Sequence, residues 1–227
     1  MINDRHFCTE LGPAPEVPGL RAALREDLRW DRGDTITVCF RGGSAALRGR
    51  IAAVAREWFA PGMAELDLVV VDHEPADVRV GFRAGAGSWS AIGTACRDVP
   101  AGDPTMNFGW LTDDSADAVL RPVVLHEFGH VVGLVHEHQS PQHPIAWNRA
   151  AVIADLSGPP NRWDIATIER NIFATHEPRR VVATDLDPHS IMMYPIPRAW
   201  TCNGFSTGFN IELSALDREL VRTVYTT

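Results

Sequence analysis

The pattern of hydrophobic and polar residues in the first half of the chain predicts strands that alternate with helices. Residues 35–40 alternate in polarity and are rich in β-branched side chains, which is typical of a strand. Ser44 then offers an N-cap for a helix whose apolar side chains recur at helical spacing, at Leu47, Ile51, Val54 and Trp58. Further strands are expected over residues 65–71, 77–83, 91–97 and 105–111. This order predicts an α+β fold built on a twisted mixed sheet.

The second half of the chain has a different sequence pattern, in which short helical segments alternate with proline-rich loops. A helix is expected over residues 161–173, and another over 214–225, where Ser214 and Asp217 have the spacing of a capping box. We therefore expect an N-terminal extension followed by one domain with two subdomains. The expected bounds are residues 1–34 for the extension, 35–227 for the domain, about 35–135 for its upper subdomain and about 136–227 for its lower subdomain.

Charge and hydrophobicity narrow the range of partners. The chain has 227 residues, of which 45% are hydrophobic, so it is long enough to bury a sizeable core. Its formal net charge is -8, which disfavours nucleic acid and anionic membrane surfaces as partners. No apolar run has the length that spans a membrane. We expect a monomer that acts on a peptide or a small molecule, without a nucleic-acid or membrane partner.

The chemistry is concentrated in the segment HEFGHVVGLVHEH. His126 and His130 are four residues apart, so on a helix they lie on one face and can share a metal ion. Glu127 points in a neighbouring direction, where a carboxylate can act as general base on a water molecule. Gly133 can end the helix in the left-handed conformation, which lets His136 return as a third ligand. Three neutral imidazoles with one water form the open, catalytic type of zinc site.

The extended motif resembles that of the metzincins, and Glu137 after the third histidine is similar to the astacin branch of that group. The stretch SIMMYP resembles the astacin Met-turn, in which a methionine packs beneath the metal and a tyrosine approaches it. By position these are Met192 and Tyr194. The family usually has a histidine where this chain has Met193, which alters the local pocket.

This resemblance implies a zincin-like metzincin fold. The upper subdomain would hold a twisted five-stranded mixed sheet and two long helices, and the lower subdomain would be mostly irregular or helical. The stretch GSWS, residues 87–90, is similar to an astacin segment upstream of the active-site helix. The strand after it would form the sheet edge and bind an extended peptide by β-addition. We expect this edge strand at Ala91, Ile92, Gly93, Thr94, Ala95 and Cys96.

The resemblance also implies an activity, a zinc-dependent endopeptidase with one catalytic zinc ion. Glu127 would take a proton from the zinc-activated water and pass it to the leaving amine. Tyr194 would ligate zinc at rest and stabilise the oxyanion during turnover. Two alternatives stay open: a maturation protease dedicated to one peptide or protein partner, and a zinc-binding module without proteolytic activity. The presence of Glu127 argues against the second.

The cysteines and the N-terminal sequence bear on location and latency. Cys8, Cys39, Cys96 and Cys202 include no Cys-x-x-Cys pair and do not fall on the disulfide positions of extracellular astacins, because Ser88 stands where a cysteine would precede the tryptophan. Residues 1–30 carry no export signal. We expect a cytoplasmic protein if the chain is intact, and a secreted one if an upstream segment was removed. The Cys8 thiolate can cap zinc and silence the enzyme, although an ordinary thiol is the favoured interpretation.

The other polar candidates have structural interpretations. His138 is expected to be neutral or exposed rather than a fourth ligand. Glu137 is expected to hold a backbone or tyrosine partner in the lower subdomain. Arg198 is expected on the surface rather than in the pocket after the scissile bond, where it would favour acidic residues. The other histidines lack ligand spacing and are expected to be surface or hydrogen-bonding residues, namely His6, His73, His143, His176 and His189.

Overall fold

A mixed sheet forms the frame of the upper part of the molecule. The computed structural model describes residues 8, 19–20, 24–140, 145–177, 181–182 and 186–226. The sheet has five strands in the order β4-β3-β5-β7-β6. Their bounds are β3 Thr35–Phe40, β4 Asp67–Val70, β5 Val78–Gly81, β6 Ser88–Ser90 and β7 Met106–Phe108. All pairings are parallel except that of β6 with β7, which is antiparallel, so the predicted mixed sheet is confirmed.

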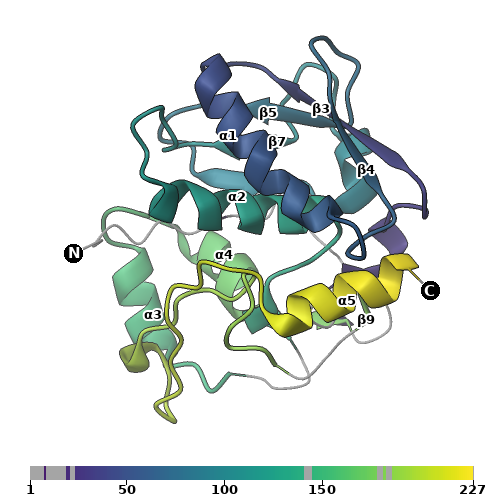
Figure 1. Cartoon of the computed structure of the whole chain (residues 1–227). Helices are drawn as coiled ribbons and strands as arrows, with labels where there is room; N and C mark the ends of the chain where they lie inside the picture. Colours follow the sequence, from purple (N-terminus) through teal and green to yellow (C-terminus); the bar gives the residue numbers. More distant parts are fainter. Residues whose placement is uncertain are drawn as a thin grey trace.

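Two long helices pack on this sheet and on each other (Figure 1). Helix α1, Ala45–Ala55, begins after Ser44, whose side chain accepts a hydrogen bond from the Leu47 amide at 3.0 Å. The chain continues as the 3-10 helix η2, Arg56–Phe59, which carries the buried Trp58. Helix α2 spans Asp117–Val131 and follows Ala116 without a side-chain cap. The core between these helices and the sheet is continuous and apolar.

The lower part is mostly helical, as predicted, and its helices are short except for the C-terminal α5. They are η4 Glu137–Gln139, α3 Arg149–Leu156, α4 Ile165–Ile168, the π-helical turn η5 Glu169–Phe173, η6 Arg198–Trp200 and α5 Ala215–Thr226. The helix predicted over residues 161–173 begins only at α4, because the Asp164 side chain caps the Thr167 amide at 2.7 Å. The capping box at α5 is confirmed, since the Asp217 amide donates to Ser214 Oγ at 2.9 Å and the Ser214 amide donates to Asp217. Helix α3 was not predicted.

Residues before the main sheet also form elements, which the hydrophobic pattern did not indicate. Strand β1, Gly19–Leu20, pairs in parallel with β8, His176–Glu177, and β2, Leu24–Arg25, pairs antiparallel with β9, Val181–Val182. The 3-10 helix η1, Glu26–Leu28, follows. Leu24 and Trp30 belong to the main core, and the Trp30 indole donates to the Val131 carbonyl at 2.7 Å. This part of the expected extension therefore anchors the end of α2.

The expected edge strand at residues 91–97 is wrong. The edge strand is β6, and Gly93–Asp98 forms the 3-10 helix η3 instead. Gly93 has a φ of 49°, and a Cβ there would overlap the Leu28 carbonyl oxygen. The Thr94 hydroxyl also donates to that carbonyl, at 3.2 Å. Ala91 still pairs beside β7, because its amide donates to the Thr105 carbonyl at 2.8 Å, and Ile92 follows it without helical structure. From Gly93 onwards, contact with η1 accompanies the change of direction, so that Gly93, Thr94, Ala95 and Cys96 lie in η3 rather than in a strand.

Among the residues that the structure describes, every helix is too short or too polar to span a lipid bilayer.

Candidate metal centre

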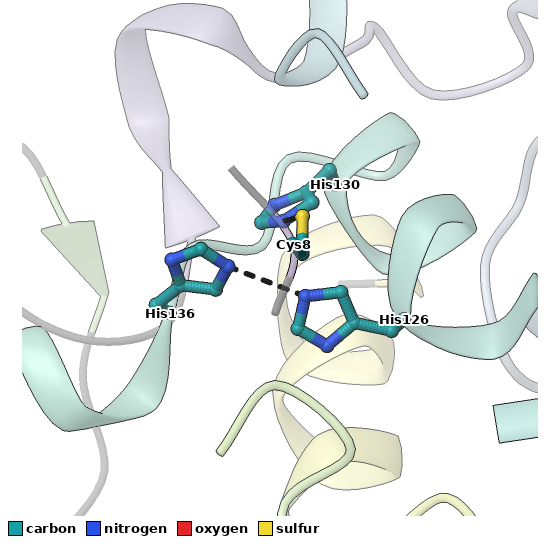
Figure 2. Close-up of side chains that lie close together, drawn as sticks. All are labelled: Cys8, His126, His130 and His136. Atoms are coloured by element: carbon teal, nitrogen blue, oxygen red, sulfur yellow. Dashed lines mark hydrogen bonds between the residues drawn. The ribbon is translucent and has the colours of Figure 1, made fainter. Parts of the chain in front are cut away.

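Helix α2 and the turn after it bring the three motif histidines together (Figure 2). His126 and His130 project from consecutive turns of α2. Gly133 has a φ of 91°, which favours glycine, and its amide donates to the His130 carbonyl at 2.8 Å. Leu24 packs against Gly133, so a side chain there would meet a filled space as well as a strained backbone. The chain reverses at this point and returns His136 to the helix face.

The ring nitrogens are arranged as metal ligands require. The Nδ1 atoms of His126 and His130 donate to the carbonyls of Ile191 at 2.8 Å and Leu134 at 2.9 Å. A proton held on Nδ1 leaves the Nε2 lone pair for a metal ion. The Nε2 atoms of His126 and His136 face each other at 3.2 Å, which is close enough for both to bind one metal ion. Burial lowers the pKa of His126 to about 4, so this imidazole stays neutral. The donor set therefore fits one zinc ion.

Cys8 lies at the same centre, which the sequence-based interpretation of an ordinary thiol did not anticipate. Its Sγ is 3.4 Å from Glu127 Oε2 and 3.6 Å from His130 Nε2. The ligand atoms of Cys8 and the three histidines all lie within 4.8 Å of one another. The Tyr194 hydroxyl donates to the main-chain carbonyl of Cys8. Cys8 is thus in contact with a metal-binding side chain, the carboxylate and the tyrosine of the motif.

The Met-turn packs directly beneath the metal-binding helix. Met192 is buried, and a Cβ on Gly129 would lie only 2.5 Å from its sulfur. Glycine at this position, between the two helical histidines, therefore permits the close approach of the methionine. Met192 therefore packs against the turn of α2 that carries His126 and His130.

A buried carboxylate that sequence reasoning did not place at the site holds the Met-turn. Asp217 of α5 accepts hydrogen bonds from Ser190 Oγ at 2.6 Å and from the Ile191 amide at 2.9 Å. Ser190 Oγ in turn accepts from the Met192 amide at 3.0 Å. The Ile191 carbonyl is the partner of His126, so this network orients a metal-binding ring. The capping-box spacing identified Asp217 as a helix cap, but no local pattern pointed to its second set of partners.

Glu137 joins the metal-binding turn to the lower subdomain. Its Oε1 accepts from the Asp187 amide at 2.9 Å, which confirms the expected backbone partner. Its own amide donates to the Met192 carbonyl at 3.1 Å. Burial, and to a smaller extent the Asp217 and Asp187 carboxylates, raise the pKa of Glu137 to about 8. Glu137 therefore positions the turn rather than binding the metal.

The remaining histidines lie away from the metal-binding centre or pack behind it. His138 is buried rather than exposed: its ring lies 4.3 Å from that of Tyr194, centroid to centroid, and its Nε2 donates to the Asn171 carbonyl at 2.8 Å. His73 and His189 are exposed, as expected. His6, His143 and the side chain of His176 lie outside the described residues.

Two other expectations concern the surface and the cysteines. Arg198 is exposed on η6 and packs against Gly204, which confirms the surface interpretation. All four cysteines are free thiols, and of these only Cys202 is exposed.

The histidine centre on this sheet-and-helix frame defines the class of protein as a zinc metalloprotease with the metzincin fold. Comparison with solved structures agrees. One structure of myroilysin is 38% identical over 90% of this chain and 98% of that chain, with a TM-score of 0.86. A second is 35% identical over 100% of this chain and 93% of that chain, with a TM-score of 0.72. Scans against family models and curated proteins gave no match.

A more distant structure shows the same fold. The hatching-enzyme zinc protease HCE-1 of the medaka fish Oryzias latipes is 14% identical, covers 88% of this chain and 95% of that chain, and has a TM-score of 0.58. Myroilysin is a bacterial astacin-family metalloprotease. The chain belongs to the astacin family of zinc metalloproteases. It is a metalloendopeptidase with one catalytic zinc and peptide or protein substrates.

Proposed function

We propose that His126, His130 and His136 hold the catalytic zinc and that Glu127 is the general base of peptide hydrolysis. When bound, zinc lowers the pKa of a coordinated water to about 7 and polarises the scissile carbonyl. Glu127 takes the proton of the attacking water on a carboxylate oxygen and delivers it to the leaving amine nitrogen. The observation that carries this proposal is that one atom, Cys8 Sγ, lies 3.4 Å from Glu127 Oε2 and 3.6 Å from His130 Nε2, and that the Glu127 side chain is only 1% exposed. Because the Glu127 carboxylate is buried, the proton that it takes from the water can pass to the leaving amine rather than to bulk solvent.

Tyr194 is the group that we assign to the oxyanion. Its hydroxyl already donates to a carbonyl oxygen at the centre, that of Cys8. This carbonyl lies where we place the scissile carbonyl of a substrate, so the same donor would meet the developing negative charge. Removing such a donor costs about 2.7–4 kcal/mol in the activation barrier.

We assign substrate positioning to the edge strand β6 rather than to residues 91–96. β6 forms the edge of the described sheet and packs against α2, the helix that carries two of the histidines. An extended peptide that adds to this edge would run along the metal-binding helix. Main-chain pairing of this kind supplies affinity with little sequence preference.

The test of this assignment is Glu127→Gln, which keeps the shape of the side chain and removes its basicity. Glu219→Gln on the exposed face of α5 is a matched control. Both substitutions are made in a Cys8→Ser background, so that the Cys8 thiol does not occupy the metal centre. We expect both variants to bind one zinc per chain, and only Glu127→Gln to lose peptide cleavage, by at least about 100-fold. Zinc content is measured by atomic absorption and cleavage with a quenched fluorescent peptide. Undiminished cleavage by Glu127→Gln would refute the general-base role, and zinc binding without cleavage by any form would favour the non-proteolytic zinc module.

We propose in addition that the conformation described is a blocked one, in which Cys8 occupies the metal centre. Three contacts support this: the Cys8 thiol reaches Glu127 and His130, and its carbonyl engages the Tyr194 hydroxyl. A thiolate is a strong zinc ligand, so Cys8 would fill the coordination position that water needs. The general base and the oxyanion donor would be engaged at the same time.

Replacement of the thiol tests this block. Cys8→Ser removes the soft ligand, and Cys202→Ser is the matched control because Cys202 is the exposed cysteine. We expect Cys8→Ser to cleave a fluorescent peptide at once, while the wild type and Cys202→Ser show a lag or little activity. Equal initial rates in all forms would show that Cys8 does not block the centre.

A further inference from the structure

A hollow with a largely apolar lining lies beside the metal centre. The space between its lining residues that no atom fills is about 470 Å³, a volume that includes open solvent, and the hollow borders both His126 and Glu127. Its apolar lining includes Trp110, Val123, Ile191, Met193, Pro195 and Phe209. A group in this hollow would lie next to the reacting atoms.

Two elements that also build the metal centre form its opposite walls. One wall is the α2 surface at Pro122 and Val123, which lie three to five residues before His126 and Glu127. Residues three or four apart on a helix share a face, so this wall and the metal-binding face are continuous. The other wall is the Met-turn, through Ile191 and Met193. The hollow is therefore fixed in place relative to the metal ligands.

Met193 gives the Met-turn wall of the hollow an apolar surface. Its side chain is only 3% exposed and lines the hollow. A methionine thioether is flexible and apolar, so it adapts to the shape of a bound apolar group. The wall beside Tyr194 is therefore apolar.

An exposed aromatic side chain stands at the rim. Phe209 lines the hollow and is 55% exposed, so a bound apolar group would bury it further. Its neighbour Asn210 is held in place, because its Nδ2 donates to the carbonyls of Pro188 at 2.9 Å and Ser190 at 2.8 Å. These hydrogen bonds fix the rim at Asn210 to the Met-turn.

The charges point to the same class of ligand. Among the described lining residues, the only acidic or basic side chain other than histidine is Glu127. A basic or acidic substrate side chain would lose its hydration here, and an acidic one would also meet the Glu127 carboxylate. Arg198, which would favour an acidic residue, is not part of the lining.

We infer that this hollow is the subsite that binds an apolar or aromatic side chain of the peptide substrate next to the scissile bond. The inference rests on the proposed function, because it assumes that hydrolysis takes place at Glu127 and the histidines. It assigns sequence preference to Met193 and Phe209, whereas main-chain pairing at β6 carries little of it.

The test is the cleavage profile of a peptide library with the wild-type chain and with Cys8→Ser. We expect Phe, Leu or Met beside the cleaved bond in most products, and Asp or Glu to be depleted there. In matched peptides, replacing that residue by Ala should lower kcat/KM by roughly 10- to 200-fold. A flat profile, or a preference for acidic residues there, would overturn the inference while leaving proteolysis intact. Cleavage of no peptide by either form would instead refute the proposed function, and the inference with it.

Substitutions in the subsite distinguish an effect on substrate preference from a general loss of folded protein. Phe209→Arg at the exposed rim should reduce kcat/KM for the Phe peptide and raise it for the Asp peptide. Ile165→Arg, at an exposed side chain on α4, is the matched control and should leave both values unchanged. Met193→Leu should retain the apolar preference that Met193→His weakens. Two results together would show that the hollow does not select the substrate. They are equal kcat/KM values of Phe209→Arg and Ile165→Arg for both peptides, and an apolar preference of Met193→His equal to that of the wild type.

Discussion

Gly129→Ala tests the close packing between the metal-binding helix and the Met-turn. The new Cβ would lie 2.5 Å from Met192 Sδ and 3.3 Å from Trp58 Cζ2. Comfortable contacts between such atoms are about 3.5–4.0 Å, so the sulfur must retreat by about 1 Å within a buried core. Overpacking of this kind costs roughly 1–3 kcal/mol. The gain in helix propensity from glycine to alanine, about 1 kcal/mol, offsets part of that cost.

Gly49→Ala is the matched control, because Gly49 lies on α1 and a Cβ there meets nothing within 4 Å. This variant should gain about 1 kcal/mol in unfolding free energy, whereas Gly129→Ala should fall about 1–3 kcal/mol below it. Urea denaturation of the metal-free proteins measures both. An equal gain in the two variants would refute the packing of Met192 against α2. Weaker zinc binding by Gly129→Ala alone is expected as well, because the displaced methionine lies beneath the metal ligands.

Two further predictions concern buried groups. Asp217→Ala leaves the Ser190 hydroxyl and the Ile191 amide without their buried acceptor, so it should lower the unfolding free energy by on the order of 3 kcal/mol. Urea denaturation checks this, and a loss below about 1 kcal/mol would contradict the network. In a thiol titration at pH 8, Cys202 should react first and the other cysteines only after unfolding, because they are buried. Burial also raises the pKa of Cys96 to about 12, which keeps that thiol protonated; equally fast reaction of Cys96 and Cys202 would contradict this burial.

The metal centre could be predicted because its determinants are local in sequence. Helical periodicity brings His126 and His130 to one face, and a glycine at Gly133 permits the turn that returns His136. The Met-turn was recognisable as a short motif of its own. Neither conclusion required knowledge of which distant segments come together.

The predictions that failed concern residues whose placement depends on segments far away in the sequence. Residues 91–97 have a pattern compatible with a strand, but from Gly93 onwards they form a 3-10 helix that contacts Leu28, far away in sequence. His138 is buried because Tyr194 and the lower-subdomain helices cover it. Cys8 lies more than a hundred residues before Glu127 in the chain, and no local pattern indicates that it returns to the metal centre. Tertiary contacts decide these placements, and a single sequence does not encode them in its periodicity.

X-ray absorption at the zinc edge of the zinc-loaded wild type and of Cys8→Ser tests the metal centre and its block most directly. We expect imidazole nitrogens from His126, His130 and His136 at about 2.0–2.1 Å, with one sulfur at about 2.3 Å in the wild type. The sulfur should vanish in Cys8→Ser while the nitrogens remain. A zinc shell without imidazole nitrogens would contradict the assigned metal centre, and a wild-type shell without sulfur would contradict its block by Cys8.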